Sequence, residues 1–380
     1  MKKILTILSA AIFAALAACT PSSRYDQINV EFTGIKVDSV HFKAINFANE
    51  ETVYDETIKL NNNRFQYMMP NGETFLIMIN PLVDPAMNPT GQYLGMSFMF
   101  FPGENINIEG KYSNGTIETV ITGSKLYSTQ DIHIKNNKAL YNKMDSISAL
   151  LYMADNQEDV QNLEAQLDDL NKQYKDGIKD YITKNPNDDF AGFIIYMLEP
   201  NDFLVYYDKL GDKVKNGRMK TFLDKYREHN KKAVEIEESK KAIQPGAEAP
   251  AFTLKDINGK NFTLNSLRGK YVVLDFWGTW CGWCMVGIPE MKAMYEKYSD
   301  KLEIVGIDCR ESEEAWKKGV ADNELPWINV YNGEKDKVDV IYGVDGYPTK
   351  VVLDPQGKIL ESFTGETPKF YEYIDELFKK

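Results

Sequence analysis

The stretch FWGTWCGWC, residues 276–284, joins two different hydrophobic patterns and carries two cysteines three residues apart. Before it, residues 271–276 are apolar except for Asp275, which is typical of a strand buried on both faces. From Cys281 onwards the pattern changes to that of a helix. Because residues 245–380 continue this alternation of strand and helix, we predict an α/β domain with a parallel or mixed sheet.

Cys281 and Cys284 form a Cys-x-x-Cys pair, a spacing that zinc sites and redox sites share. A zinc ion would need two further ligands, and the sequence offers neither a second such pair nor a nearby histidine. The histidines of the chain are His41, His133 and His229. A static structural disulfide is the remaining alternative to a redox pair. We therefore expect no metal here, and no cofactor other than the redox-active disulfide itself.

The position of each cysteine predicts its role. Cys281 stands at the start of the helix, where unpaired backbone N–H groups and the helix dipole favour a thiolate. Cys284 lies one turn further and more shielded, so it can attack a mixed disulfide formed at Cys281. Asp275 sits in an apolar strand, where desolvation raises the pKa of a carboxyl and lets it exchange protons near neutral pH. The alternative for Asp275 is a carboxylate that binds a polar partner and has no catalytic part.

Several residues around the pair carry a resemblance to a known family. Trp280 precedes the pair, Pro289 lies inside the following helix, and the run GYPT occupies residues 346–349. Residues 246–270, with the runs PAF and LRGK, add a further segment. Together they resemble the thioredoxin superfamily, and most closely the TlpA/ResA-like periplasmic thiol–disulfide oxidoreductases. The resemblance covers the C-terminal domain and implies a thioredoxin-like fold, with Asp275 as the proton acceptor of the resolving cysteine.

The resemblance also implies where substrates bind. The GYPT run would be the cis-proline loop that faces the two cysteines, and its Tyr347 and Pro348 join Trp280 and Trp283 as expected substrate-binding residues. The implied substrates are thiols and disulfides of envelope proteins, and the second partner is an unidentified electron donor or acceptor. The implied activity is that of a protein disulfide oxidoreductase that works by dithiol–disulfide exchange.

The sequence departs from the family pattern at three places. The dipeptide between the cysteines is Gly282-Trp283 where thioredoxins have Gly-Pro, which leaves the redox potential open. Gly287 stands where some members carry a functional glutamate, so Asp275 is expected to supply any carboxylate role. Ile304 occupies the expected place of thioredoxin's lysine partner for the buried aspartate, and the sequence shows no other evident partner.

The N-terminus has the pattern of a secretory signal peptide. Two lysines precede an apolar run over residues 4–18, which is shorter than the ~20 residues of a transmembrane helix. The run ends in LAAC at Cys19, which resembles the lipobox of bacterial lipoproteins, where this cysteine is acylated. We therefore expect a signal peptide over residues 1–18, a lipid anchor on Cys19 and a periplasmic location. Thr20 stands where an aspartate would retain the protein at the inner membrane, so the outer membrane is favoured.

Two further regions lie between the leader and the redox domain. Residues 19–125 predict a β-rich domain, a sandwich or small barrel, because short strand-like runs alternate with turn residues. These runs cover residues 39–47, 75–80, 96–101, 106–112 and 116–121. Residues 126–244 predict a helical region, since apolar residues recur every three or four positions from Val160 to Tyr181. The tripeptide Gln-Pro-Gly at 244–246 marks the boundary with the redox domain.

Composition narrows the function further. The 380 residues carry a formal net charge of −12, which argues against a nucleic-acid-binding protein because such proteins need a basic face.

Cys309 has no evident partner among the four cysteines, so we expect an unpaired thiol, with a third redox thiol as the alternative. Two other functions remain open. One is a thiol peroxidase, whose Pro-x-x-x-Thr/Ser-x-x-Cys motif lacks its proline here, and the other is an envelope-binding lipoprotein with a secondary redox domain.

Overall fold

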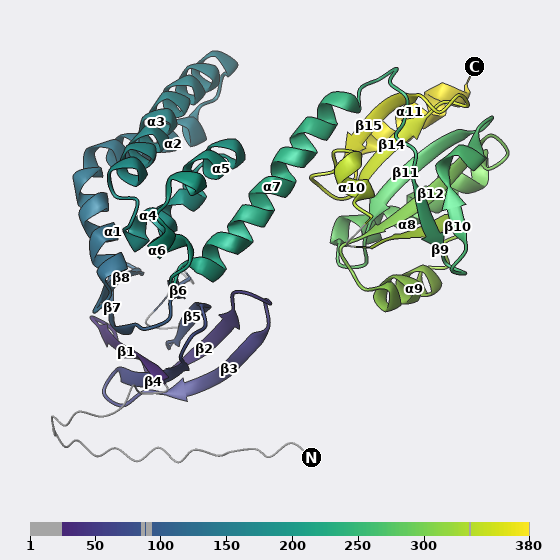
Figure 1. Ribbon diagram of the computed structural model, residues 1–380. Coiled ribbons are helices and arrows are strands. Elements are labelled where there is room, and N and C mark those ends of the chain that lie inside the picture. The colour runs from purple at the N-terminus through teal and green to yellow at the C-terminus, as the bar shows by residue number, and fades with distance from the viewer. Residues whose placement is uncertain (1–24, 85–87, 89–92, 334–335, 380) are drawn as a thin grey trace, which may run out of the picture. The chain divides into compact units, whose positions relative to one another are not determined.

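The structure is a computed structural model that describes residues 25–84, 88, 93–333 and 336–379 (Figure 1). Within these residues no helix is long and apolar enough to cross a membrane. The described residues form two compact units, one made of those up to Met197 with Lys209–Lys225 and the other of Leu198–Asp208 with those from Tyr226 onwards. The predicted signal peptide and the predicted lipid attachment at Cys19 lie outside the described residues.

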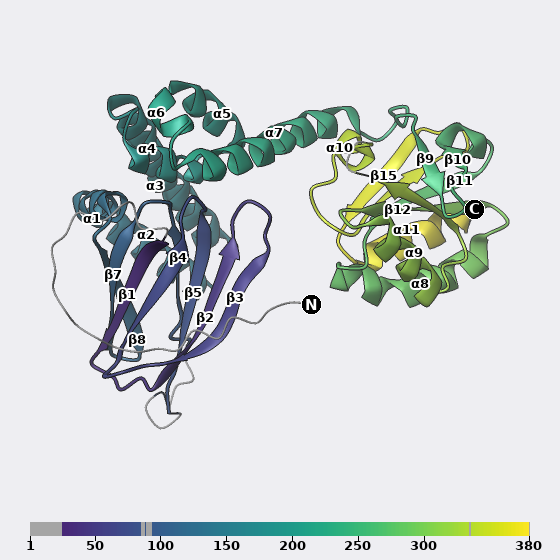
Figure 2. The ribbon, with the colours of Figure 1, turned by 60° about the horizontal axis from the view of Figure 1, so that its bottom comes forward.

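The described part of the first unit begins with two four-stranded sheets, in the orders β4-β1-β7-β8 and β3-β2-β5-β6 (Figure 2). Neighbouring strands are antiparallel except for β1 and β7, which are parallel. The strands are β1 (Tyr25–Thr33), β2 (Ser39–Asn46), β3 (Thr52–Lys59), β4 (Arg64–Pro70), β5 (Phe75–Leu82), β6 (Met96–Phe100), β7 (Asn105–Ser113) and β8 (Thr116–Thr122). The five predicted strands are confirmed, and β1, β3 and β4 are additional.

The two sheets pack face to face around an apolar core. Alternate residues of β7, including Ile106 and Ile108, are buried, as expected for a strand with one covered face. A side chain at Gly110 of β7 would come within 2.8 Å of Phe32 in its own sheet and 2.9 Å of Met96 in the other. Only glycine allows so close an approach here, and the predicted β-rich domain is confirmed.

Helices follow the strands in the order α1 (Lys125–Asn136), α2 (Lys138–Met153), α3 (Gln157–Lys184), α4 (Asp189–Ile194), η2 (Ile195–Met197), α5 (Pro200–Lys209), α6 (Asp212–Lys215) and α7 (Lys220–Ala242). The apolar stripe predicted between Val160 and Tyr181 lies on the less exposed face of α3, with Leu170 and Ile178 buried. The helical stretch is divided between the two units, because α5 and most of α7 group with the C-terminal residues.

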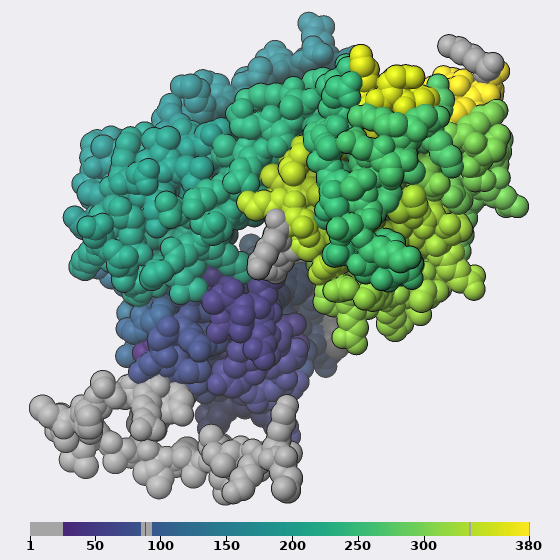
Figure 3. Space-filling view, turned by 45° about the vertical axis from the view of Figure 1, so that its right-hand side comes forward, coloured from purple at the N-terminus to yellow at the C-terminus, as the bar shows by residue number. Residues whose placement is uncertain are grey.

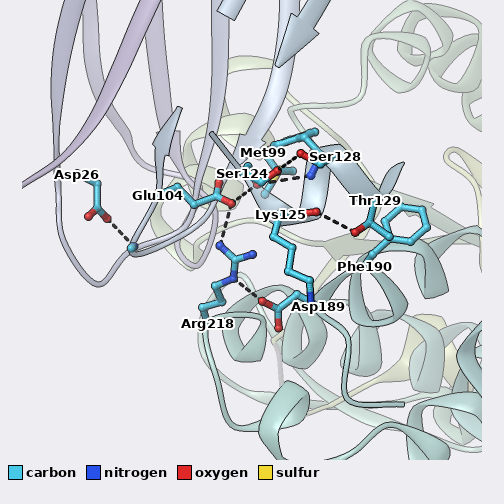
Figure 4. A network of polar contacts seen from close by, with 12 residues as sticks. Asp26, Met99, Glu104, Ser124, Lys125, Ser128, Thr129, Asp189, Phe190 and Arg218 are labelled. Atoms are coloured by element: carbon cyan, nitrogen blue, oxygen red, sulfur yellow. Dashed lines mark hydrogen bonds and ion pairs between the residues drawn. The ribbon is translucent and has the colours of Figure 1, made fainter. Parts of the chain in front are cut away.

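An ion-pair network joins the helices to the sheets within the first unit (Figure 4). Arg218, just before α7, donates from Nη1 to Oε1 of Glu104 at 2.8 Å and from Nε to Oδ2 of Asp189 at 2.6 Å. The hydroxyl of Ser124, the N-cap of α1, also donates to Glu104. The Glu104 side chain is 2% exposed, so these contacts replace the hydration that burial removes.

The second unit contains a seven-stranded sheet in the order β10-β9-β13-β12-β11-β14-β15. The elements are β9 (Thr253–Asp256), β10 (Asn261–Thr263), η3 (Leu264–Leu267), β11 (Tyr271–Trp277), α8 (Gly282–Tyr298), β12 (Leu302–Cys309), α9 (Glu313–Asp322), β13 (Ile328–Asn332), α10 (Val338–Ile341), β14 (Thr349–Leu353), β15 (Ile359–Thr364) and α11 (Pro368–Phe378). The central strands β11, β12 and β13 are parallel, whereas β14 and β15 pair antiparallel. The mixed α/β sheet is therefore as predicted.

Both faces of this sheet are covered. Successive strand residues point to opposite faces, so Val272, Leu274 and Phe276 of β11 join one apolar core. Val273 and Trp277 join the core on the other face, together with both cysteines of the pair. Figure 3 shows the second unit, coloured green to yellow, as a closely packed body. The redox pair is thus packed into an apolar core at the end of a central strand.

Candidate active site

The cysteine pair lies at the junction of β11 and α8. Cys281 is the N-cap of α8, and its Sγ accepts the backbone N–H of Cys284 at 3.2 Å. The two sulfurs form a disulfide, and each cysteine is only 6% exposed. Pro289 lies inside α8, where the sequence placed it. The structure therefore places both cysteines at the predicted junction of strand and helix, with Cys281 one position before the first helical residue. The greater shielding expected for Cys284 is not seen, because both cysteines are packed into the same core and are equally exposed.

The loop before the pair is held by residues of the next parallel strand and the turn after it. Thr279 donates its backbone N–H to Oε1 of Glu311 at 2.8 Å and its hydroxyl to Oε2 of the same carboxylate. The indole Nε1 of Trp280 donates to the carbonyl oxygen of Cys309 at 2.8 Å. A side chain at Gly278 would meet this indole at 2.4 Å, so glycine is required there. Glu311 was not singled out from sequence, because only the fold brings it to Thr279.

Exposed apolar side chains surround the buried sulfurs. Trp280 is 48% exposed, Trp283 is 67% exposed, and Val286 on the next turn of α8 is 64% exposed. The ring of Tyr347 lies edge-on to Trp280 with ring centres 5.2 Å apart, and the guanidinium of Arg310 stands over Tyr347 at 4.9 Å. Apolar surface left open beside a reactive disulfide is suited to contact with another protein.

Of the two predicted loop residues, Tyr347 is half-buried and Pro348 is buried. The peptide bond between them is cis, as the resemblance implied. The carbonyl of Pro348 accepts the N–H of Gly365 at 2.7 Å. Tyr347 packs against the core that holds both cysteines. Trp280 and Tyr347 are therefore in direct contact, whereas Trp283 is exposed at the start of α8.

Asp275 has a cationic neighbour that the sequence did not reveal. It pairs in register with Lys350 of β14, and Nζ of Lys350 lies 3.8 Å from its Oδ1. The same Nζ lies 2.9 Å from Oε2 of Glu366, in the turn before α11. Burial raises the pKa of Asp275, Lys350 opposes this, and Glu366 reinforces it. The lysine expected near Ile304 is therefore supplied from a different strand, and the only signal was a single lysine in the apolar run TKVVL.

Glu366 occupies space that Gly287 leaves open beside α8. A side chain at Gly287 would come within 2.3 Å of Oε2 of Glu366. The other oxygen of Glu366 accepts from the hydroxyl of Tyr371 at 2.6 Å. The carboxylate of Glu366 therefore lies beside Gly287, where some family members carry a glutamate on α8, but here it comes from the turn before α11. Asp275 is consequently not the only buried carboxylate available near the pair.

Cys309 is a buried free thiol. Its Sγ donates to the carbonyl of Ile307 at 3.5 Å and accepts from Nδ2 of Asn332 at 3.8 Å. Burial, and then the charge of Asp339, raise the pKa of this thiol far above its usual range. It is therefore a neutral thiol at physiological pH and a poor nucleophile. This geometry supports the unpaired residue over the third redox thiol.

Among the described residues, no three or more His, Cys, Asp or Glu side chains are grouped so that they could hold a metal ion. The site comprises a buried disulfide, an aromatic rim and a largely buried carboxylate–lysine–carboxylate cluster.

Comparisons with known proteins identify the family of the C-terminal domain. The AhpC/TSA family matches residues 245–362. The thiol-disulfide oxidoreductase ResA of Bacillus thuringiensis is 38% identical over 143 residues, which cover 37% of this chain and 80% of the relative. The chain belongs to the ResA-like thiol-disulfide oxidoreductases. ResA of Bacillus subtilis is 35% identical over 127 residues, covering 33% of this chain and 70% of the relative.

A solved structure adds a further likeness. The thioredoxin domain of a thiol-disulfide oxidoreductase from Bacteroides vulgatus is 31% identical, with a TM-score of 0.33, and covers 35% of this chain and 97% of that domain. As a member of the ResA-like family, the chain has a thioredoxin-fold C-terminal domain and performs dithiol–disulfide exchange on protein thiols and disulfides. The N-terminal sheets and helices lie outside the matched residues.

Proposed function

We propose that this oxidoreductase is anchored by a lipid in the periplasm and reduces or exchanges disulfides of envelope proteins through Cys281 and Cys284. The observation that carries the redox part is the buried disulfide at the start of α8, rimmed by the exposed rings of Trp280 and Trp283. A partner chain can cover these rings and thereby exclude water from the sulfurs during exchange.

The exchange proceeds in two steps. The Cys281 thiolate attacks one sulfur of a substrate disulfide, forms a mixed disulfide and releases the other sulfur as a thiolate. Cys284, whose thiol proton Asp275 accepts, then attacks the Cys281 sulfur and expels the second substrate thiolate. Two electrons pass from the cysteine pair to the substrate, and two protons pass to the released thiolates. The pair ends as the disulfide seen here, and an unidentified electron donor must reduce it again.

The position of Cys281 supports the assignment of attack and resolution. Cys281 caps α8, so the free N–H groups of the first turn and the helix dipole stabilise its thiolate. Cys284 lies three residues further along α8, and both cysteines belong to the core that adjoins β11. Tyr347 packs against the core that holds the pair and contacts Trp280. With Pro348 and Trp283, these two residues are the proposed binding surface for a substrate segment.

The proposed location rests on the N-terminal pattern. Residues 1–18 have the charged start and apolar run of a signal peptide, and LAAC at 16–19 has the lipobox order. A periplasmic protein works where disulfides persist, which suits the chemistry of the pair. The outer membrane is favoured over the inner one because Thr20, not aspartate, follows Cys19.

Trapping of a mixed disulfide tests the proposal. Reduced full-length protein is mixed with an oxidised disulfide-containing protein such as insulin, and adducts are read on non-reducing gels and by mass spectrometry. Cys284→Ser should accumulate an adduct through Cys281, whereas Cys281→Ser should trap little. Cys309→Ser is the matched control, and its turnover should equal that of the wild type. Equal trapping by Cys281→Ser and Cys284→Ser would show that the assigned roles are wrong.

A further inference from the structure

A buried charge cluster lies behind the redox pair, and the exchange steps above use only one of its members. The side chains of Asp275, Lys350 and Glu366 are 11%, 3% and 12% exposed. Lys350 stands between the two carboxylates, but its Nζ is 2.9 Å from Glu366 and 3.8 Å from Asp275. Oδ1 of Asp275 is buried and accepts no hydrogen bond within the described structure. The single ammonium group of Lys350 therefore pairs with both carboxylates, but it lies closer to Glu366 than to Asp275.

The position of Glu366 is determined by more than its ion pair. Tyr371 donates to its Oε1 at 2.6 Å, and its Oε2 fills the space above Gly287 of α8. Lys350 is constrained too, because its ammonium lies 5.5 Å from the ring centre of Phe370. Since α8 also carries Cys284, the carboxylate of Glu366 is packed against the helix of the resolving cysteine.

We infer that Glu366 is a positioning residue for the known reaction: it holds the charge of Lys350 away from Asp275 and so keeps Asp275 able to take the proton of Cys284. This inference rests on the proposed role of Asp275. Without Glu366, the ammonium of Lys350 would have Asp275 as its only carboxylate partner among these three residues. A carboxylate paired with a cation in a buried site is a weaker base, because the charged form is stabilised.

The polar and charged groups around Asp275 come from β14, from the α11 end of the chain and from α8, while β12 places Gly306 beside it. Lys350 projects from β14, Glu366 from the turn before α11 and Tyr371 from α11 itself, while Glu290 of α8 acts on Tyr371. Burial is the largest cause of the raised pKa of Asp275, and Lys350 and Glu366 then act in opposite directions. Removal of the Glu366 charge takes away one cause that raises the pKa of Asp275 and leaves Lys350, which lowers it, opposed by burial alone, so this pKa should fall.

The proton of Cys284 moves to Asp275 during resolution of the mixed disulfide. The S–H bond of Cys284 breaks, its proton passes to the carboxylate of Asp275, and the thiolate forms a bond to the Cys281 sulfur of the mixed disulfide. The bond between Cys281 and the substrate sulfur breaks, and the substrate leaves as a thiolate. That thiolate takes a proton, and Asp275 then releases its own proton. The electrons move as in the exchange described above, and Glu366 and Lys350 change neither bonds nor protonation.

The test measures the titration of Asp275 directly. Full-length protein labelled with carboxyl-¹³C aspartate is titrated by NMR in the reduced form, and Asp275→Asn identifies the resonance. Glu366→Gln should lower the pKa of Asp275 measurably. Glu372→Gln, an exposed position on α11, is the matched control and should leave the pKa of Asp275 unchanged. Glu366→Asp keeps the negative charge on a shorter side chain, so it should lower the pKa of Asp275 less than Glu366→Gln does.

A second variant reaches the same carboxylate from another residue. Gly287→Ala adds a methyl group where Glu366 lies, pushes the carboxylate aside and should lower the pKa of Asp275 in the same direction. An Asp275 pKa that is the same in Glu366→Gln, Gly287→Ala and Glu372→Gln, or that rises in the first two, would overturn the inference.

Kinetics separate this inference from the proposed function. The rate at which a preformed Cys281 mixed disulfide is resolved is measured against pH. In Glu366→Gln, the inflection of this profile should move to lower pH together with the pKa of Asp275. If the pKa of Asp275 moves but Asp275→Asn resolves with the wild-type pH profile, the coupling stands and the role of Asp275 is wrong. If Asp275→Asn resolves slowly but Glu366→Gln leaves the pKa of Asp275 unchanged, the proposed role of Asp275 stands and the inference about Glu366 is wrong.

Discussion

Replacement of Arg218 by methionine should destabilise the N-terminal unit by several kcal/mol. Arg218 makes two charged hydrogen bonds, to Glu104 at 2.8 Å and to Asp189 at 2.6 Å. The Glu104 side chain is 2% exposed and the Asp189 side chain 30% exposed. Methionine fills the volume of the aliphatic stem but leaves the Glu104 carboxylate buried with only the Ser124 hydroxyl among the groups drawn in Figure 4.

The magnitude follows from the two contacts. Removing one partner of a buried ion pair costs about 3–5 kcal/mol, because the other charge stays desolvated. The contact with Asp189 is partly exposed and adds at most ~1 kcal/mol. Arg218 itself is 23% exposed, which places the expected loss at the lower end, about 3 kcal/mol. For a unit of this size, each kcal/mol shifts the melting temperature by ~2–4 °C, so a fall of roughly 10 °C is expected.

Differential scanning calorimetry of the full chain, with urea unfolding as a second measurement, gives the loss. Lys172→Met is the matched control, because it removes an exposed contact at 3.1 Å with Asp176 on α3 and should cost less than ~0.5 kcal/mol. Glu104→Gln combined with Arg218→Met should recover part of the loss, since the buried charge is then absent. The reasoning is refuted if Arg218→Met costs no more than Lys172→Met.

Three further predictions follow from single residues. Burial and Glu311 raise the pKa of Asp308 to about 10, so the contribution of Asp308 to stability falls as pH rises from about 4 to 10. The melting temperature of Asp308→Asn should therefore increase relative to that of the wild type over this pH range. A difference in melting temperature that does not change with pH would contradict this. Cys309 should resist iodoacetamide in the native oxidised protein and react once unfolded, and a disulfide from Cys309 in most molecules would show otherwise. Cys19 should incorporate a fatty-acid label that Cys19→Ala lacks, and equal labelling of both would disprove the lipid anchor.

The elements around the redox pair were predictable because their signals are local. A buried parallel strand needs a continuous apolar run, and the run at 271–276 became β11 (Tyr271–Trp277). The periodicity after Cys281 became α8, and the run GYPT contains the cis peptide before Pro348. In the N-terminal region β3 (Thr52–Lys59) was missed, because most of its residues are exposed and polar, so it lacks the apolar alternation that marks a strand.

What the sequence by itself determined is the arrangement of the pair: two thiols one helical turn apart, the first at a helix start, with no second Cys-x-x-Cys pair in the chain and no histidine near them in sequence. Only the tertiary structure decided what surrounds them. Lys350 reaches Asp275 because β14 pairs with β11 in a particular register, and Glu366 reaches α8 because the turn before α11 packs there. Such contacts depend on strand order and helix packing, which bring together residues whose positions along the chain carry no mark of their proximity.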